Sequence, residues 1–291
     1  MIEKKEKKLH TFAICAYGDS PYLEECMASL ACQRQKSEII CCTSTPSPYI
    51  EGLAEKYRIP LYVREGESGI REDWLFAYRK ASGDLVTIAH QDDRYEKRYA
   101  ETLFSMYEKY PDMTVFCSDY ATLRMERETE APKLQLVNAV WLVKKLLRLP
   151  LRFKGLSDRK AVKRAALLFG NSVCCPSCTY NKKLIGDQLF ESDFEFALDW
   201  DNLYQLACRP GRFVCSERPL IFYRVHPGAT TKQCIEDNRR KNDETAMFRK
   251  MWPESMVKLF MYFYKKAYRA YEKYSSNREV EWRTQPWNRE R

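Results

Sequence analysis

Glycine, histidine and long apolar runs are all scarce in this sequence. Its 291 residues include 10 glycines and 3 histidines. So few glycines exclude glycine-rich repeats and flexible linkers as a major part of the chain. No run approaches the ~18 consecutive apolar residues of a membrane-spanning helix. The first ten residues also contain no apolar signal segment.

The remaining composition is that of a packed protein with an excess of positive charge. Hydrophobic residues make up 45% of the chain and charged residues 31%, which excludes an intrinsically disordered protein. The net charge of +9 favours anionic partners such as nucleotides, lipid headgroups or nucleic acid. Because no zinc-finger or RNA-recognition motif is present, we expect no nucleic-acid partner.

Cysteine, in contrast, is abundant, with 12 residues. Cys41-Cys42 and Cys174-Cys175 are adjacent pairs inside apolar runs, which favours buried free thiols. A zinc site at Cys174, Cys175 and Cys178 would need a second CxxC or a histidine pair, and neither follows. Since the N-terminus lacks a signal segment, we expect a cytoplasmic protein with reduced cysteines.

Strand and helix signals alternate through the first 124 residues. Short apolar runs predict strands at 10–16, 38–42, 60–64, 84–90 and 113–119. Helical spacing of apolar residues predicts helices at 21–30, 49–57, 69–81 and 95–110. Ser20 would cap the first helix, with Pro21 at its first position. This alternation predicts an α/β fold whose mainly parallel sheet has helices on both faces.

The pattern changes after residue 124. Residues 134–149 and 157–169 predict two basic amphipathic helices. Further strand signals occur at 170–180, 213–214 and 220–225, and a terminal helix is predicted from Pro253 onward. The two basic helices have three interpretations: contact with an anionic membrane surface, an insertion packed on the main domain, or a self-association surface.

Two adjacent carboxylates, Asp92 and Asp93, follow the predicted strand 84–90. Ligands of open α/β sheets bind at the carboxyl ends of strands. Magnesium commonly uses one or two carboxylates together with substrate phosphates. The pair therefore predicts a divalent-cation site against a diphosphate, although a solvated turn also explains an isolated Asp-Asp.

Three other motifs carry candidate chemistry. The turn at Tyr17 lies between a strand and a helix, where backbone N–H groups can receive a base or phosphate. Asp199 is a candidate general base, and Trp200 is either a flat wall for a sugar ring or a core residue beside a helix cap. Arg224 and His226 share one face of a strand, where both can meet phosphate and His226 can ligate a metal.

In this order the motifs resemble a family 2 glycosyltransferase with the nucleotide-diphospho-sugar-binding GT-A fold, over residues 11–231. Residues 11–33 are similar to the family's opening strand and helix, and 81–86 lead into Asp92-Asp93 as the family's strand leads into its metal-binding aspartates. Leu198-Asp199-Trp200-Asp201 stands where the family has an acidic pair containing the catalytic base. Residues 220–226 match the closing strand, which often ends in Tyr-Arg-x-His.

The resemblance implies a GT-A, Rossmann-like fold with a helical insertion and C-terminal helices. It implies inverting transfer from a nucleotide-diphospho-sugar, most often a UDP-sugar, to a hydroxyl of a glycan or lipid-linked glycan acceptor. Asp199 would be the base, and Mn²⁺ or Mg²⁺ would be held by Asp92, Asp93 and His226. Donor contacts would come from Ala16, Tyr17, Thr43, Ser44, Asp73, His90, Gln91, Asp92, Trp200 and Arg224.

The resemblance also implies how the chain is divided. Residues 1–124 would form the nucleotide-sugar-binding half, and 171–231 the acceptor and catalytic half. Residues 125–170 would be a basic helical insertion, and 232–291 a C-terminal helical extension. We expect a cytoplasmic protein with peripheral contact at the inner face of the membrane.

Three departures from the family pattern bear on these roles. The second strand ends in Cys41-Cys42-Thr43-Ser44-Thr45 where the family has aspartates, so hydroxyls and backbone groups would replace a carboxylate. His90 stands where the metal motif normally begins with Asp, which leaves Asp92 as the expected ligand. Leu198 replaces the usual Glu, which leaves Asp199 as the candidate base.

Two alternatives remain open on the sequence. A nucleotidyltransferase also uses metal carboxylates on an α/β sheet, but it would need a basic triphosphate loop that the turn after Ala16 lacks. A non-catalytic nucleotide-sugar-binding or scaffold module is favoured by the missing acidic residues at Thr43 and Leu198. The presence of Asp92-Asp93, Asp199 and His226 argues against it, because a binding module needs no base.

Overall fold

The computed structural model describes residues 8–124, 133–136, 139–226 and 239–264. The chain forms two compact units, Met1–Arg240 and Lys241–Arg291. The first contains the sheet and the predicted site. In the second, α11 (Arg239–Met251) is followed by helical residues 254–264, and Phe248 packs on Phe260. None of the described helices is long and apolar enough to cross a bilayer.

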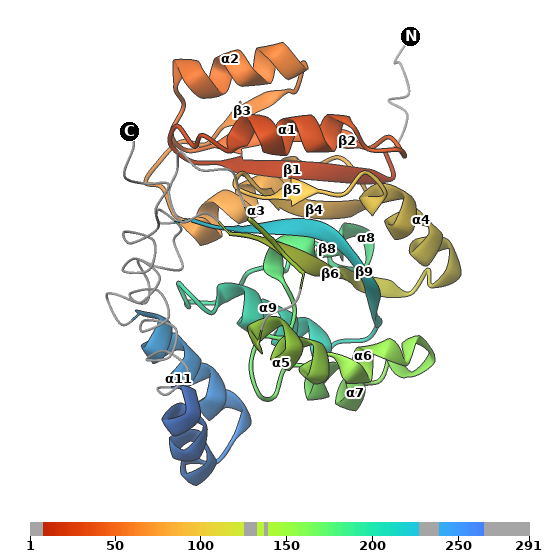
Figure 1. The fold of residues 1–291 in the computed structure, drawn as a ribbon, viewed down its shortest axis with the longest axis vertical. Coiled ribbons are helices and arrows are strands. Elements are labelled where there is room, and N and C mark those ends of the chain that lie inside the picture. The colour runs from red at the N-terminus through yellow and green to blue at the C-terminus, as the bar shows by residue number, and fades with distance from the viewer. Residues whose placement is uncertain (1–7, 125–132, 137–138, 227–238, 265–291) are drawn as a thin grey trace, which may run out of the picture. The chain divides into compact units, whose positions relative to one another are not determined.

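The centre of the first unit is a mixed sheet, in which the described residues form nine strands in the order β3-β2-β1-β4-β8-β6-β9-β5, with β7 paired to β6 (Figure 1). The strands are β1 (His10–Ala16), β2 (Glu38–Thr43), β3 (Leu61–Val63), β4 (Leu85–His90), β5 (Arg94–Tyr95), β6 (Met113–Arg124), β7 (Lys133–Gln135), β8 (Thr179–Asn181) and β9 (Arg212–Val225). Strands β3, β2, β1 and β4 are parallel, as are β6 and β9, whereas β8 runs antiparallel between β4 and β6. The predicted α/β fold with a mainly parallel sheet is confirmed.

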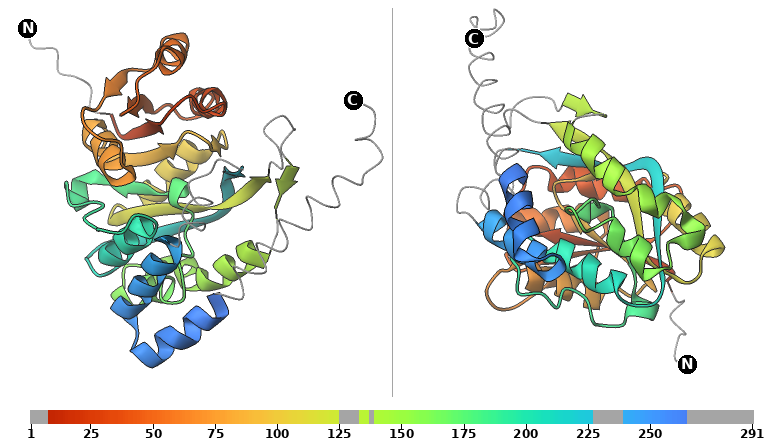
Figure 2. Two further views of the ribbon diagram at one scale, coloured as in Figure 1. Left: turned by 90° about the vertical axis from the view of Figure 1, so that its left-hand side faces the viewer. Right: turned by 90° about the horizontal axis from the view of Figure 1, so that it is seen from below.

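Helices cover both faces of this sheet (Figure 2). They are α1 (Leu23–Ala31), α2 (Pro48–Tyr57), α3 (Ile70–Lys80), α4 (Tyr99–Lys109), α5 (Ala139–Leu147), α6 (Leu149–Arg152), α7 (Lys160–Ala165), α8 (Lys182–Ile185) and α9 (Leu198–Ala207). Alternation along β1 separates the faces. Phe12 and Ile14 belong to the core with α1, α2 and α4, whereas Cys15 contacts the backbone of α3.

A chain of buried polar groups joins the two halves of the sheet. His10 Nε2 lies 2.8 Å from the hydroxyl of Thr87, which lies 2.5 Å from that of Thr179 on β8. The hydroxyl of Tyr99 from α4 then lies 2.9 Å from Thr179. Burial lowers the pKa of His10 to about 3, so the ring is neutral and can bridge hydroxyls. Because each of these groups has a partner, the row of buried hydrogen bonds helps to fix β8 between its neighbours.

Several sequence predictions of local structure were wrong. Residues 133–135 form β7 on the edge of β6, and the predicted helix 134–149 begins only at Ala139 and breaks before Leu149. The predicted helix 157–169 is reduced to α7, and 170–180 contributes only a short 3₁₀ turn, Cys175–Ser177, and the start of β8. The two predicted strands at 213–214 and 220–225 are one continuous strand, β9. Residues 125–132 and the predicted terminal helix beyond 264 lie outside the described residues.

The first helix also begins later than predicted, at Leu23. Its flanking residue Tyr22 makes no side-chain cap hydrogen bond. The hydroxyl of Ser20 instead donates to Asp92 Oδ1 at 2.7 Å. A residue that resembles a helix cap in sequence is thus used to bind the carboxylate of the loop after β4.

Gly83 sets the start of β4, the strand that leads into Asp92. A Cβ added to Gly83 would lie 2.8 Å from the backbone of His10 and Thr11. We expect Gly83→Ala to lower the free energy of unfolding by about 1–3 kcal/mol, because the backbone of β1 cannot give way locally. Gly52→Ala is the matched control, since Gly52 lies within α2 and has nothing within 4 Å of an added Cβ. That variant should be neutral or stabilising in urea denaturation; equal losses in both would contradict the close approach at Gly83.

Candidate active site

The loops that follow β1, β2 and β4 are hydrogen-bonded to one another. The backbone N–H of Tyr17 donates to Gln91 Oε1 at 2.9 Å, and Gln91 Nε2 donates to the Tyr17 carbonyl at 2.9 Å. The N–H of Gly18 donates to Thr45 Oγ1 at 2.8 Å, and the Thr45 N–H donates to Thr43 Oγ1 at 3.0 Å. The amide of Gln91 is therefore occupied with joining two loops, which leaves the exposed ring of Tyr17 as the accessible group here.

A carboxylate from α3 stands beside the end of β2. The Ser44 hydroxyl lies 3.0 Å from Asp73 Oδ2, and Arg64 Nε donates to Asp73 Oδ1 at 2.7 Å. The side chains of Arg64 and Asp73 are only 15% and 18% exposed. The end of β2 has no acidic residue in its sequence, but Asp73 of α3 places a carboxylate beside it.

Asp92 is the accessible carboxylate at the end of β4. Its side chain is 31% exposed, Oδ1 accepts from Ser20, and Oδ2 lies 3.3 Å from His226 Nε2. Burial acts to raise the pKa of Asp92, but the nearby His226 imidazole and the hydrogen bond from Ser20 outweigh it and lower the pKa below its ordinary value. Asp92 is therefore ionised at neutral pH and presents negative charge to a ligand.

Asp93 and Arg224 are buried together under this turn. The Arg224 N–H donates to Asp93 Oδ1 at 2.8 Å, and Arg224 Nε donates to the Asp92 carbonyl at 2.8 Å. The guanidinium also pairs with Glu25 of α1 and lies 4.5 Å from the ring of Tyr22. The Arg224 side chain is 2% exposed. In this position it stabilises the turn and does not present its charge to a phosphate.

A divalent cation fits the corner formed by Asp92 and His226. His226 Nε2 is a buried nitrogen for which the described residues provide no hydrogen bond of good geometry, yet it faces Asp92 Oδ2. A carboxylate oxygen and an imidazole nitrogen suit Mn²⁺, and Mg²⁺ would rely on the oxygen. Within the described residues, no three His, Cys, Asp or Glu side chains converge, and Asp93 is committed to Arg224. The fitting donor set is thus Asp92 and His226, completed by a ligand's phosphate oxygens.

Asp199 occupies the first turn of α9 in a different environment. Asn171 Nδ2 donates to its Oδ2 at 2.7 Å, and the Trp200 N–H donates to its Oδ1 at 2.8 Å. Burial raises the pKa of Asp199, opposed by the charge of Lys144 on α5 and by these hydrogen bonds. The residue as a whole is partly exposed. A carboxylate with a raised pKa is suited to accept a proton.

The 3₁₀ turn Cys175–Ser177 lies near both carboxylate sites. Cys175 Sγ lies 3.8 Å from His90 Nε2. Burial raises the pKa values of the Cys174 and Cys175 thiols, and the charges of both Asp93 and Asp199 contribute to the rise. Since the charges of Asp93 and Asp199 both act on these thiols, the loop after β4 and the start of α9 lie near the same turn.

The aromatic wall of this region differs from the predicted one. Trp200 is 3% exposed and its Nε1 donates to the Leu167 carbonyl at 3.0 Å, so the predicted sugar contact is wrong and Trp200 is a core residue. Trp74 of α3 is the aromatic residue beside His90: it is half-buried and stacks on His90 with ring centroids 5.0 Å apart. Its other neighbour is Phe190, which lines a pocket of about 330 Å³.

The sequence analysis missed five contributors: Ser20, Glu25, Trp74, Lys144 and Asn171. Four of them lie on elements whose pairing partners are far along the chain, so no local spacing reveals them. Ser20 was noticed, but as a helix cap. His90 keeps its predicted position at the site; burial lowers its pKa to about 4, so the ring that faces Trp74 is neutral.

Comparison with known proteins agrees with this arrangement. The model of the family described as glycosyl transferase family 2 matches residues 11–182. No curated protein matches the chain. The crystal structure of S. aureus TarS 1-349 is similar with a TM-score of 0.52 at 17% identity, over 74% of this chain and 60% of that one. Its complex with UDP-GlcNAc gives a TM-score of 0.51 at 16% identity, over 77% and 60%.

A second solved relative is glucosyl-3-phosphoglycerate synthase from Mycobacterium tuberculosis in complex with phosphoglyceric acid. It is similar with a TM-score of 0.50 at 14% identity, over 78% of each chain. Identities this low establish the shared GT-A fold alone, and the chain spans about 60% of the length of TarS 1-349. Because the family model covers more than half of the residues, the protein belongs to glycosyl transferase family 2.

Proposed function

We propose that the protein transfers a sugar from a UDP-sugar to a hydroxyl of a glycan or lipid-linked glycan, with inversion at the anomeric carbon. One observation carries this proposal: the pKa values of two carboxylates, Asp92 after β4 and Asp199 at the start of α9, are shifted in opposite directions. The pKa of Asp92 is lowered, so this group is ionised, whereas the pKa of Asp199 is raised. Pairs of this kind divide electrostatic and proton-transfer roles in many enzymes.

The donor would bind across the ends of β1, β2 and β4. Its nucleoside would meet Tyr17, Thr43, Ser44 and Asp73, and its diphosphate would approach Asp92. The TarS structure that binds UDP-GlcNAc shares this fold, which supports UDP as the nucleotide. Of the two predicted cations, Mn²⁺ suits the Asp92–His226 corner better because it accepts imidazole nitrogen. When bound, the cation would neutralise charge on the leaving diphosphate.

Asp199 would act as the general base. It removes the proton from the acceptor hydroxyl while that oxygen forms a bond to the anomeric carbon. The bond from that carbon to the diphosphate oxygen breaks on the opposite side, and the diphosphate leaves with the electron pair. Asn171 and the Trp200 N–H hold the carboxylate in place, so that its lone pairs are directed before the acceptor arrives.

The proposed organisation follows from these roles. Residues 1–124 would bind the donor, 171–231 would carry the base, 125–170 would be an insertion on the acceptor side, and 232–291 an extension. The cytoplasmic location stays a prediction of the sequence. A non-catalytic module of the same fold is the alternative; it is disfavoured because Asp199 has the raised pKa that a base requires and a binding module does not.

Donor binding can be tested by thermal unfolding. UDP with Mn²⁺ should raise the Tm by about 5–10 °C at ~100 times its Kd, since a ligand of the folded state stabilises by mass action. CDP and GDP should raise the Tm less than UDP does. Asp92→Ala should abolish the Mn²⁺-dependent part of the shift, whereas Asp193→Ala, a fully exposed carboxylate, should leave it unchanged. A full shift in Asp92→Ala would refute the assigned cation site.

The base can be tested with Asp199→Asn. We expect kcat to fall on the order of 10²–10⁴-fold while UDP-sugar affinity stays close to that of the wild type, because the amide cannot take up the proton. Asp201→Asn is the control within the same helix, since Asp201 bonds Gln205 and should leave the proton transfer intact. Unchanged turnover in Asp199→Asn would exclude it as the base.

The pH profile offers a separate check on Asp199. The carboxylate must be deprotonated, so kcat/KM should fall as the pH drops through its raised pKa. Asn171 donates to the charged form, so Asn171→Ala should raise the pKa further and move the acid limb to higher pH. An acid limb that does not move would contradict control of this titration by Asn171.

A further inference from the structure

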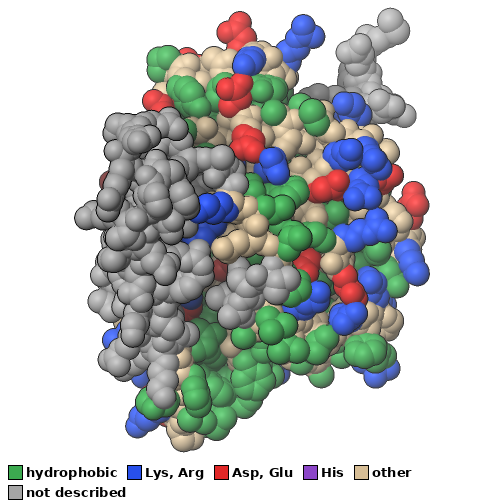
Figure 3. Space-filling model, in the orientation of Figure 1, with side chains coloured by type: hydrophobic (Ala, Val, Ile, Leu, Met, Phe, Trp, Pro, Cys, Tyr) green, Lys and Arg blue, Asp and Glu red, His purple; other side chains and the backbone are tan. Residues whose placement is uncertain are grey.

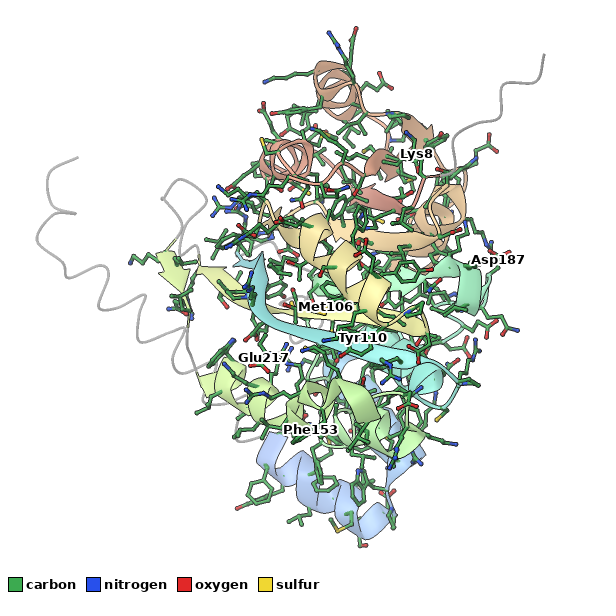
Figure 4. The ribbon with its side chains drawn as sticks, turned by 90° about the vertical axis from the view of Figure 1, so that its right-hand side faces the viewer. Lys8, Met106, Tyr110, Phe153, Asp187 and Glu217 are labelled. Carbon is green, nitrogen blue, oxygen red and sulfur yellow. The ribbon has the colours of Figure 1, made fainter. Side chains whose placement is uncertain are left out.

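The insertion carries a row of exposed apolar side chains, which we call the stripe. The stripe is formed by Leu142, Leu146, Leu149, Phe153 and Leu156, which follow one another at steps of four, three, four and three residues. Their exposed fractions are 50%, 56%, 39%, 67% and 41%. Figure 3 shows hydrophobic side chains gathered over α5 and α6, and Phe153 is labelled in Figure 4. A row of large apolar groups in water marks a binding surface.

The opposite side of the insertion is firmly attached to the sheet. Arg148 donates to Asp119 Oδ1 of β6 at 2.7 Å, and Trp141 Nε1 donates to the same oxygen at 3.0 Å. Leu151 is fully buried, and Lys163 donates to the carbonyls of Arg209 and Gly211. The stripe is therefore exposed on a rigidly mounted element and is not a core face that has failed to pack.

The helical part of this insertion is strongly basic. Residues 139–169 contain nine Lys or Arg and one Asp, a net charge of +8 in a chain of net charge +9. Arg148, Arg152 and Lys163 have protein partners. Four cations that neighbour the stripe in sequence form no ion pair with an acidic side chain in the described part of the chain: Lys145, Lys154, Arg159 and Lys160.

We propose that the stripe and these four cations form a docking surface for an anionic lipid bilayer. Apolar side chains of this kind enter the headgroup boundary, and the long stems of Lys and Arg let their charges reach anionic headgroups. Each cation near such a surface adds to the attraction. The charge disfavours the other occupants: a second copy would bring the same cations together, and residues 265–291 hold eight Lys or Arg against four Asp or Glu.

Docking would also bring the membrane close to the proposed base. Lys144 lies two residues from both Leu142 and Leu146, on the far side of α5 from the stripe, and its charge acts on Asp199. The stripe and the side chain that acts on Asp199 therefore lie on opposite sides of one helix. This step rests on the proposed function and identifies the acceptor as one presented at the membrane surface.

Vesicle sedimentation of the full chain tests the docking surface. Vesicles of phosphatidylcholine with about one third phosphatidylglycerol should bind the protein at least ~10-fold more tightly than phosphatidylcholine alone, and salt should weaken the binding. Leu146→Glu with Phe153→Glu should reduce binding ~10-fold or more, because carboxylates replace the inserted side chains. Replacing the four cations with Gln should remove the preference for phosphatidylglycerol.

Leu184→Glu is the matched control, because Leu184 is 51% exposed on α8 and lies outside the stripe. It should bind vesicles like the wild type. Binding that the stripe variant retains, or that is absent from both kinds of vesicle, would overturn the proposal. So would a wild-type dimer that becomes monomeric in the stripe variant while vesicles stay unbound. UDP-induced stabilisation, measured on the same samples, separates this outcome from a failure of the proposed donor site.

Discussion

The site depends on one buried hydrogen bond, from the backbone N–H of Arg224 to the carboxylate of Asp93. It joins the end of β9 to the turn after β4, although the two residues are 131 positions apart in the chain. Burial raises the pKa of Asp93 well above its ordinary value, opposed by the Arg224 N–H and charge. Leaving one partner of such a buried hydrogen bond unsatisfied costs about 1–3 kcal/mol. The accessible Asp92 therefore lies on a turn whose rearrangement would break this hydrogen bond and cost free energy.

The two carboxylates with proposed chemical roles differ because their neighbours differ. Asp92 receives a hydroxyl and faces an imidazole, both of which favour its charged form. Burial is the main influence on the pKa of Asp199 and raises it, and the hydrogen bonds of Asp199 offset only part of that rise. An anion that stays charged suits a cation and a diphosphate, whereas an anion whose proton affinity is raised suits proton removal. The fold thus separates the tasks by placing one group at a strand end and the other in the first turn of a helix.

The sequence could predict those parts of the fold and site that depend on local pattern. The alternation of strands and helices through residue 119, and the place of Asp92 at a strand end, follow from short-range periodicity. Trp200 could not be assigned, because its direction depends on the carbonyl of Leu167. Arg224 was expected to face a ligand, but its neighbour Glu25 is 199 positions away. Asp73 could be named from the resemblance, and its partnership with Ser44 appears only when α3 is packed beside β2.

The insertion shows why the interpretations of its basic helices could not be separated from sequence. Basic residues of the insertion have different environments. Arg148 is 4% exposed and ion-paired to the sheet, whereas Arg159 and Lys160 are exposed to solvent. Hydrophobic residues divide in the same way between Leu151 and Phe153. Packing on the main domain and contact with a membrane are therefore not competing descriptions. The buried ion pair gives α5 and α6 a fixed orientation, and a fixed orientation is what allows a narrow apolar stripe to meet a flat surface while Lys144 stays beside the proposed base.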